Sequence, residues 1–188
     1  MYEQSRTRIV VDMLNDFISG TMACQNAENA MMHSINYINA HPGHKVVYVC
    51  DTHPANHCSF TGYGGQWPPH CVVSTMGQEI HLSYYTRVND PNARPHLMRI
   101  FRKGTNPGKE EYSGFNATRS DGTPLHKILT KQVVVSGIAT EFCVYETVKD
   151  LVEAEFDVQV LLEGLAYVNQ KDHRATIEKM KSLGVKFI

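Results

Sequence analysis

The sequence has no excess of charge of either sign and no long apolar run. Its 188 residues contain 18 Lys and Arg against 19 Asp and Glu, so it lacks the basic surface that nucleic acids or anionic membranes require. No apolar stretch is long enough to cross a bilayer, and the opening segment MYEQSRTR lacks the apolar core of a signal peptide. We therefore expect a cytoplasmic protein without nucleic-acid or membrane partners.

Regular cysteine spacing is absent as well. The chain has five cysteines, an odd number without the spacing of a disulfide framework and without a C-x-x-C pair, which favours reduced thiols. No repeat, linker or low-complexity tract divides residues 1–188. With 42% apolar and 20% charged residues the composition is ordinary for a globular protein, and we expect one domain with a proper core.

What the sequence does contain is an alternation of short β-rich runs and helical segments. Near-continuous Val and Ile runs indicate strands covered on both faces, joined by right-handed crossovers. The expected strands are Thr7–Val11, Val46–Cys50, Arg99–Arg102, Gln132–Ser136, Val158–Leu162 and Val185–Ile188, and the expected helices are Cys24–Ala40, Leu125–Thr130, Phe142–Glu153 and Asp172–Leu183. The predicted fold is a three-layer α/β/α sandwich around a mostly parallel, six-stranded, Rossmann-like sheet.

Polar side chains follow several of these strands directly. Asp12, Asp51 and Lys103 each come just after a predicted strand, and the turn Gly137–Cys143 follows another. Ligands of open α/β sheets bind outside the carboxyl ends of the strands, so we expect these groups at one edge. Alone, such an Asp is usually a turn former, a Lys is solvated and a Cys is a small buried hydrophobe. Their coincidence favours a catalytic site.

Cys143 has the setting of a reactive thiol. The stretch VVVSGIATEFCVYETV indicates a strand, a turn and a helix, with Thr140 as a plausible N-cap and Cys143 in the first helical turn. There the helix dipole is expected to lower the thiol pKa, and the free N–H groups can hold the oxyanion of an attacked carbonyl. The other cysteines lack this setting.

A second polar group lies in the long irregular segment that begins after Asp51. Asp51 and His53 are two residues apart, so in an extended segment their side chains point the same way, and His57 and His70 follow. A carboxylate with imidazoles is a normal ligand set for Zn²⁺, Fe²⁺ or Mn²⁺. Spacing alone leaves open a polar loop whose histidines cap turns, and His57 as a hydrogen-bond donor to a ligand.

Together these motifs resemble the nicotinamidase (pyrazinamidase) branch of the isochorismatase-like cysteine hydrolases. The similar segments, in the family's order, are IVVDMLNDFISG (Ile9–Gly20), VCDTHPANHCSF (Val49–Phe60), WPPHCVVSTMG (Trp67–Gly77), KGTNPGKEEYSGF (Lys103–Phe115) and VSGIATEFCV (Val135–Val144). The resemblance implies a catalytic triad of Asp12, Lys103 and Cys143. It also implies an oxyanion hole at the backbone of Ala139 and Cys143, next to a cis peptide after Ile138.

A metal ion and an aromatic pocket are further implications of the resemblance. The implied metal ligands are Asp51, His53 and His70, and His57 matches a histidine that some members use as an extra ligand. We expect one divalent ion, zinc, with iron or manganese as alternatives. The expected substrate-binding residues are Phe17, Trp67, Tyr112, Ile138 and Phe142.

The implied function is hydrolysis of nicotinamide, and also pyrazinamide, by a cysteine nucleophile, a step of NAD salvage. The chain departs from the family at Leu14, where Gln is common, and at Glu141-Phe142, where Asp-Tyr or Asp-His is usual, which bears on substrate choice. Alternatives are a related hydrolase of another small carboxamide or carbamoyl compound, and a metal-binding or thiol-redox module without hydrolysis. Because the family commonly self-associates, we expect a homo-oligomer.

Overall fold

The computed structural model describes residues 6–188, so most of the segment MYEQSRTR lies outside the described residues. At its centre is a six-stranded sheet in the order β3-β2-β1-β4-β5-β6, in which all neighbouring strands are parallel. The strands are β1 (Thr7–Val11), β2 (Lys45–Asp51), β3 (Ile100–Lys103), β4 (Gln132–Gly137), β5 (Asp157–Leu165) and β6 (Lys186–Phe187). The six expected strands are confirmed, and the sheet is wholly rather than mostly parallel.

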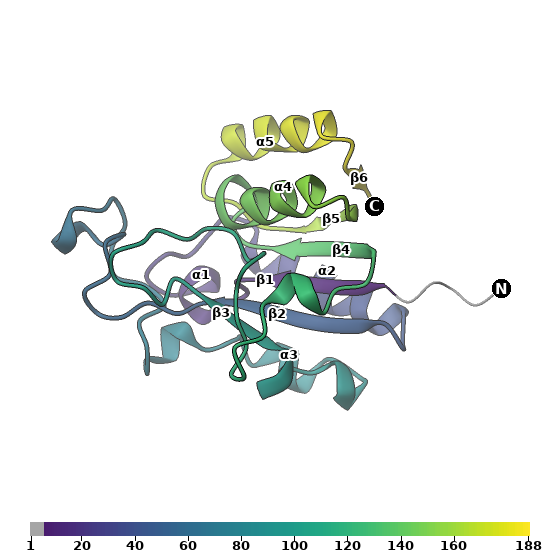
Figure 1. Ribbon diagram of the computed structural model, residues 1–188, viewed down its shortest axis with the longest axis horizontal. Helices are drawn as coiled ribbons and strands as arrows, with labels where there is room; N and C mark the ends of the chain where they lie inside the picture. The colour runs from purple at the N-terminus through teal and green to yellow at the C-terminus, as the bar shows by residue number, and fades with distance from the viewer. Residues whose placement is uncertain (1–5) are drawn as a thin grey trace.

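Helices cover both faces of the sheet and complete the three-layer α/β/α fold (Figure 1). They are α1 (Asn15–Ile18), α2 (Ala27–Ala40), α3 (Ser83–Thr86), α4 (Tyr145–Glu153) and α5 (Gln170–Ser182). On one face, Ile35 of α2 lies in an apolar cluster with Val10. On the other, Val148 of α4 and Met180 of α5 lie in a second cluster with Ile9. Because neighbouring residues of a strand point to opposite faces, the uninterrupted Val and Ile runs supply both clusters.

The start of α2 differs from the prediction. This helix begins at Ala27 rather than at Cys24. Gln25 forms an antiparallel bridge with Tyr167, and Asn26 has a left-handed backbone with φ of 64°. The segment before α2 is therefore part of an extended contact with the chain after β5, and this contact lies beside the pocket over Cys143.

Two irregular regions also differ from the pattern or refine it. The expected helix Leu125–Thr130 is a single 3-10 turn over Leu125–Lys127, because an extended Pro124 precedes it and β4 begins at Gln132. The long segment between β2 and β3 contains α3 and four short 3-10 turns. Among the residues described, no helix combines the length and the apolar character needed to cross a membrane.

The strand order places the four candidate residues that follow strands at one edge of the sheet: Asp12, Asp51, Lys103 and Cys143. From β1 the chain adds β2 and β3 on one side and β4, β5 and β6 on the other, so the winding reverses between β1 and β4. Val11 is in register with Val49 of β2 and with Gly137 of β4, and Asp51 is in register with Lys103 of β3. In open α/β sheets the usual ligand crevice lies at such a reversal, outside the carboxyl ends of the strands.

Gly137 allows the end of β4 to approach β1 closely. Its φ is 144°, and a Cβ at this position would lie 2.1 Å from the carbonyl oxygen of Val11. Only glycine fits such a contact. The turn that carries Cys143 therefore starts directly against the end of the strand that carries Asp12.

Candidate active site

Two carboxylates and one amine meet at the ends of β1, β2 and β3. Lys103 Nζ lies 2.9 Å from Asp12 Oδ2 and also contacts Asp51 Oδ1, and all three side chains are buried. Asp12 Oδ1 accepts a hydrogen bond of 2.8 Å from the backbone N–H of Asp51. A buried charge is costly without a partner, so the single cation is needed to hold both carboxylates in place.

The three groups shift one another's pKa values. Burial and the charge of Asp51 raise the pKa of Asp12 to about 6, although Lys103 opposes this shift. Burial opposes the ionisation of Asp51 as well, but Lys103 and His53 hold its pKa below the ordinary value. The pKa of Lys103 lies well above its ordinary value, because the two carboxylates outweigh its burial. At neutral pH Lys103 therefore keeps its positive charge, and Asp12 is a carboxylate that takes up a proton readily.

Cys143 lies beside this group, in a π-helical turn (Thr140–Val144) between β4 and α4. Its Sγ is 3.3 Å from Lys103 Nζ. One carboxylate oxygen each from Asp12 and Asp51 lies within 4.8 Å of Sγ and of each other. The structure therefore brings together the acid, the base and the thiol that the strand ends predicted.

Two expectations about this thiol are corrected. The expected N-cap, Thr140, does not cap the helix, because its hydroxyl donates to the carbonyl of Ala166 at 3.0 Å. The pKa of Cys143 is raised and not lowered; burial is the main cause, and the nearby carboxylates add to it against the charge of Lys103. The resting thiol is therefore neutral and needs a base before it can attack a carbonyl.

The turn that leads to Cys143 leaves β4 through a cis peptide bond between Ile138 and Ala139, as the resemblance implies. Ala139 and Cys143 line the same pocket, so both expected oxyanion-hole residues border one cavity. Ile138 is not among the side chains that line it. Its side chain is fully buried in an apolar cluster, and its expected contact with substrate stays a prediction.

Asp51 belongs to a second group, with His53 and His70. One carboxylate oxygen and one ring nitrogen of each histidine lie within 4.8 Å of one another, and all three residues are buried. His53 Nδ1 donates to the carbonyl of Gly104 at 2.9 Å and His70 Nδ1 to that of Pro68 at 2.8 Å, so Nε2 is the ring nitrogen that each histidine can offer to a metal ion once it carries no proton. A Cβ on Gly104 would lie 2.4 Å from the His53 ring, so glycine is required there. Two imidazoles in their neutral form and a carboxylate at this spacing fit one divalent metal ion.

His57 lies outside that ligand group. Its Nδ1 is 2.6 Å from Ser59 Oγ and its Nε2 is 3.1 Å from the carbonyl of Lys109, so both ring nitrogens are engaged. The ring packs on His53 with centroids 4.1 Å apart. In this geometry His57 supports the orientation of His53, and its nitrogens are not part of the ligand group.

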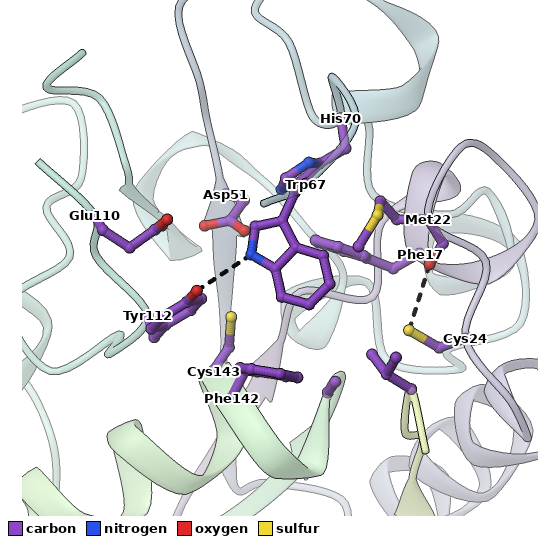
Figure 2. Close-up of a pocket in the computed structure, with 12 residues that line it drawn as sticks. Phe17, Met22, Cys24, Asp51, Trp67, His70, Glu110, Tyr112, Phe142 and Cys143 are labelled. Atoms are coloured by element: carbon purple, nitrogen blue, oxygen red, sulfur yellow. Dashed lines mark hydrogen bonds between the residues drawn. The ribbon is translucent and has the colours of Figure 1, made fainter. Parts of the chain in front are cut away.

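An aromatic pocket opens over Cys143 (Figure 2). The space between its lining residues is about 410 Å³ when the open solvent at its mouth is included. The Phe142 ring lies edge-on to Trp67, with centroids 5.2 Å apart, and 5.6 Å from Tyr112. Trp67 Nε1 donates to the Tyr112 hydroxyl at 3.2 Å, and Phe17 lines the same pocket. Four of the five expected substrate-binding residues thus surround one cavity.

Four further residues line the pocket that no sequence motif indicated: Met22, Cys24, Glu110 and Val168. Figure 2 shows Met22 and Cys24 on the opposite side of Trp67 from Glu110. Glu110 stands two residues before Tyr112, so the alternation of an extended segment was an available signal. The other three come from irregular segments without periodicity, where the sequence carries no such signal.

Comparison with known proteins identifies the class that this fold and site define. The isochorismatase domain family matches residues 7–188, and the chain belongs to this family. Nicotinamidase/pyrazinamidase of Mycobacterium tuberculosis is 33% identical over 97% of this chain and 98% of its own. The solved structure of pyrazinamidase of Pyrococcus horikoshii in complex with zinc has a TM-score of 0.82 at 36% identity and covers 97% of both chains. That of PnC1 from L. infantum in complex with nicotinate has a TM-score of 0.80 at 30% identity and covers 98% of this chain and 92% of that one.

These similarities narrow the class. The five curated relatives, 25–33% identical to this chain, are named nicotinamidases, and one of them nicotinamidase/pyrazinamidase. Within the isochorismatase family the chain therefore lies in the nicotinamidase/pyrazinamidase branch, which confirms the resemblance drawn from its motifs.

Proposed function

We propose that this protein is a metal-dependent cysteine amidohydrolase that converts nicotinamide to nicotinate and ammonia, and that it also accepts pyrazinamide. The observation that carries the proposal is the position of Cys143, whose thiol lies 3.3 Å from the Lys103 amine on the floor of an aromatic pocket. The names of its relatives and the nicotinate bound to one of them support this substrate class. Deamidation of nicotinamide is a step of NAD salvage.

The first half of the reaction forms a thioester. Asp12 accepts the proton of the neutral Cys143 thiol, and Sγ attacks the carboxamide carbon of the substrate. The N–H groups of Ala139 and Cys143 hold the oxyanion. The Lys103 cation stabilises the negative charge as it passes from the Asp12 carboxylate to the Cys143 sulfur. Asp12 then returns the proton to the leaving nitrogen, so ammonia departs and the acyl group stays on sulfur.

The second half hydrolyses this thioester. Water attacks the acyl carbon, Asp12 takes a proton from it, and the same backbone N–H groups hold the second oxyanion. Collapse of this intermediate releases nicotinate and returns the proton to the Cys143 thiol. The two halves together consume one water and one amide and release one acid and one ammonia.

Three side chains beside the pocket are proposed to hold the metal ion. Asp51, His53 and His70 offer a carboxylate oxygen and two Nε2 atoms, a set that suits zinc, with iron and manganese as alternatives. A divalent ion held there supplies a Lewis acid beside the pocket. His70 also packs on Phe17, with ring centroids 5.5 Å apart, so the ligand group borders the surface that receives the ring.

The decisive experiment is ammonia release from nicotinamide, pyrazinamide and an aliphatic amide, with and without a chelator. We expect release from both ring amides, little from the aliphatic amide, and loss after verified metal removal. Release only from another carboxamide or carbamoyl compound would favour the related-hydrolase alternative. Metal binding with no ammonia from any amide would favour a metal-binding or thiol-redox module.

We further propose that residues 1–188 act as one domain in the cytoplasm and self-associate. The support is the family's common behaviour and the continuous match over residues 7–188. Light scattering of the purified protein measures its molecular mass directly. A mass of one chain at all concentrations would contradict the proposed self-association.

A further inference from the structure

One side of the pocket is an apolar wall made by two segments of the chain. Met22 and Cys24 belong to the segment before α2, and Val168 belongs to the segment between β5 and α5. An antiparallel bridge joins the two segments: Gln25 N–H donates to Tyr167 O at 2.8 Å, and Tyr167 N–H donates to Gln25 O at 3.2 Å. The wall is therefore a paired structure, not a free loop.

Val168 separates the pocket from a second hollow. Val168 and Phe142 line the pocket over Cys143, and both also line an open surface groove beside α5. Because the same two residues border both spaces, they form the partition between them. A shorter side chain at Val168 is expected to remove part of this partition.

Glu141 holds the backbone of this partition. Its two carboxylate oxygens accept hydrogen bonds from the N–H groups of Val168, at 3.3 Å, and Asn169, at 2.7 Å. Glu141 lies in the π-helical turn that carries the proposed nucleophile. A second tie joins the same two segments, since Thr140 N–H donates to Ala166 O at 2.9 Å. The turn that carries Cys143 therefore fixes the position of this wall through hydrogen bonds.

We propose that Val168 is a specificity-determining residue and Glu141 a positioning residue, which together limit the size of substituent that the substrate ring can carry. The inference rests on the proposed function for the identity of the ring, a pyridine carboxamide. Neither residue belongs to the group of Asp12, Lys103 and Cys143, so changing either alters which rings fit and leaves the chemical step in place.

The test measures ring binding without turnover. Trp67 is the single tryptophan of the chain and lines the pocket, so its fluorescence reports occupancy. Pyridine-3-carboxylate and its derivatives with a methyl or ethyl group at each free ring carbon are titrated into wild type and variants. In Val168→Ala we expect at least one alkylated ring to gain about tenfold in affinity relative to the unsubstituted ring, the scale of a methylene in an apolar pocket.

Variants of Glu141 test the positioning role. Glu141→Ala is expected to favour the same alkylated ring as Val168→Ala, by a smaller factor, because the valine stays but the backbone N–H groups of Val168 and Asn169 lose their acceptor. Glu141→Gln keeps one acceptor oxygen and is expected to lie between Glu141→Ala and wild type. For nicotinamide turnover, KM should rise in these variants while kcat stays within about twofold.

Asn169→Ala is the matched control. It removes the side-chain cap of α5, which accepts from Lys171 N–H at 2.8 Å, and it keeps the backbone N–H that donates to Glu141. We expect its ring preference to equal that of wild type. An unchanged preference in Val168→Ala, or an equal shift in Asn169→Ala and Glu141→Ala, overturns the inference. A wild type that binds these rings but releases no ammonia contradicts the proposed function instead, since ring preference is measured independently of turnover.

Discussion

The floor and the rim of the pocket are built in different ways. The floor holds Asp12, Asp51 and Lys103 at the ends of paired strands and Cys143 in the turn after β4, with every side chain buried. The rim holds Trp67 and Tyr112 on irregular segments, half-buried and joined to each other by one hydrogen bond. Reacting groups are thus positioned by the cooperative sheet, whereas ring contacts depend on a few local bonds. Substitutions in the floor should change rate, and in part folding, while substitutions in the rim should change mainly ring affinity.

The largest expected effect is at the thiol of the floor. Cys143→Ala should lower kcat for nicotinamide by about four orders of magnitude or more, because the nucleophile is lost. Cys24→Ala, the other thiol that lines the pocket, is the matched control and should keep kcat within about tenfold. Ammonia release measures both. Substantial turnover by Cys143→Ala would contradict the covalent mechanism.

Lys103→Met tests whether floor residues also support folding. Without the cation, Asp12 and Asp51 are left as two buried carboxylates, so the free energy of unfolding should fall by about 3–5 kcal/mol and activity should be lost. The matched control is Lys109→Met, which breaks an exposed ion pair with Glu111 and should cost at most about 1 kcal/mol. Urea unfolding measures both free energies. Equal losses in the two variants would show that Lys103 supports folding no more than an exposed lysine does.

The metal-ligand group should show a smaller effect, on metal affinity. His70→Ala removes one proposed ligand and should weaken metal binding by about a hundredfold or more. His57→Ala removes only a ring that packs on His53, so we expect a loss of about tenfold. Metal content by mass spectrometry after dialysis against graded chelator separates the two. A greater loss in His57→Ala than in His70→Ala would reverse their assignment.

The rim should show the smallest effect. Trp67→Ala removes an aromatic face of the pocket, so KM for nicotinamide should rise about tenfold with a smaller change in kcat and none in stability beyond about 1 kcal/mol. Trp67→Phe keeps a ring but loses the N–H that donates to Tyr112, and should lie closer to wild type. Steady-state kinetics check both. A fall in kcat that exceeds the rise in KM would assign Trp67 to the floor.

The strands and the floor were largely predictable from the sequence. The predicted strands that became β1, β2 and β3 are each followed by a polar residue, and parallel strands end at one edge, so Asp12, Asp51 and Lys103 had to lie near one another. The pairing of Cys143 with this group followed from the same rule.

Other parts of the site were not predictable. Thr140 has the residue type of an N-cap, but its hydroxyl is used by Ala166, a contact 26 residues away that no local pattern contains. Burial likewise reversed the expected pKa shift of Cys143, because burial depends on the packed fold. Val168 and Cys24 reach the pocket only because two distant segments pair, so local periodicity gives no sign of either.

Asp51 is shared by both groups of the site, and this has a thermodynamic consequence. Its Oδ1 contacts Lys103, and its Oδ2 lies 3.5 Å from His53 Nε2 in the ligand group. Occupancy of the ligand group and the charge on the amine therefore act on one carboxylate. By reciprocity, if neutralising Lys103 changes the metal dissociation constant by some factor, metal binding changes the balance between the two states of Lys103 by the same factor. Metal binding and the protonation of Lys103 are then linked equilibria, and neither can be altered alone.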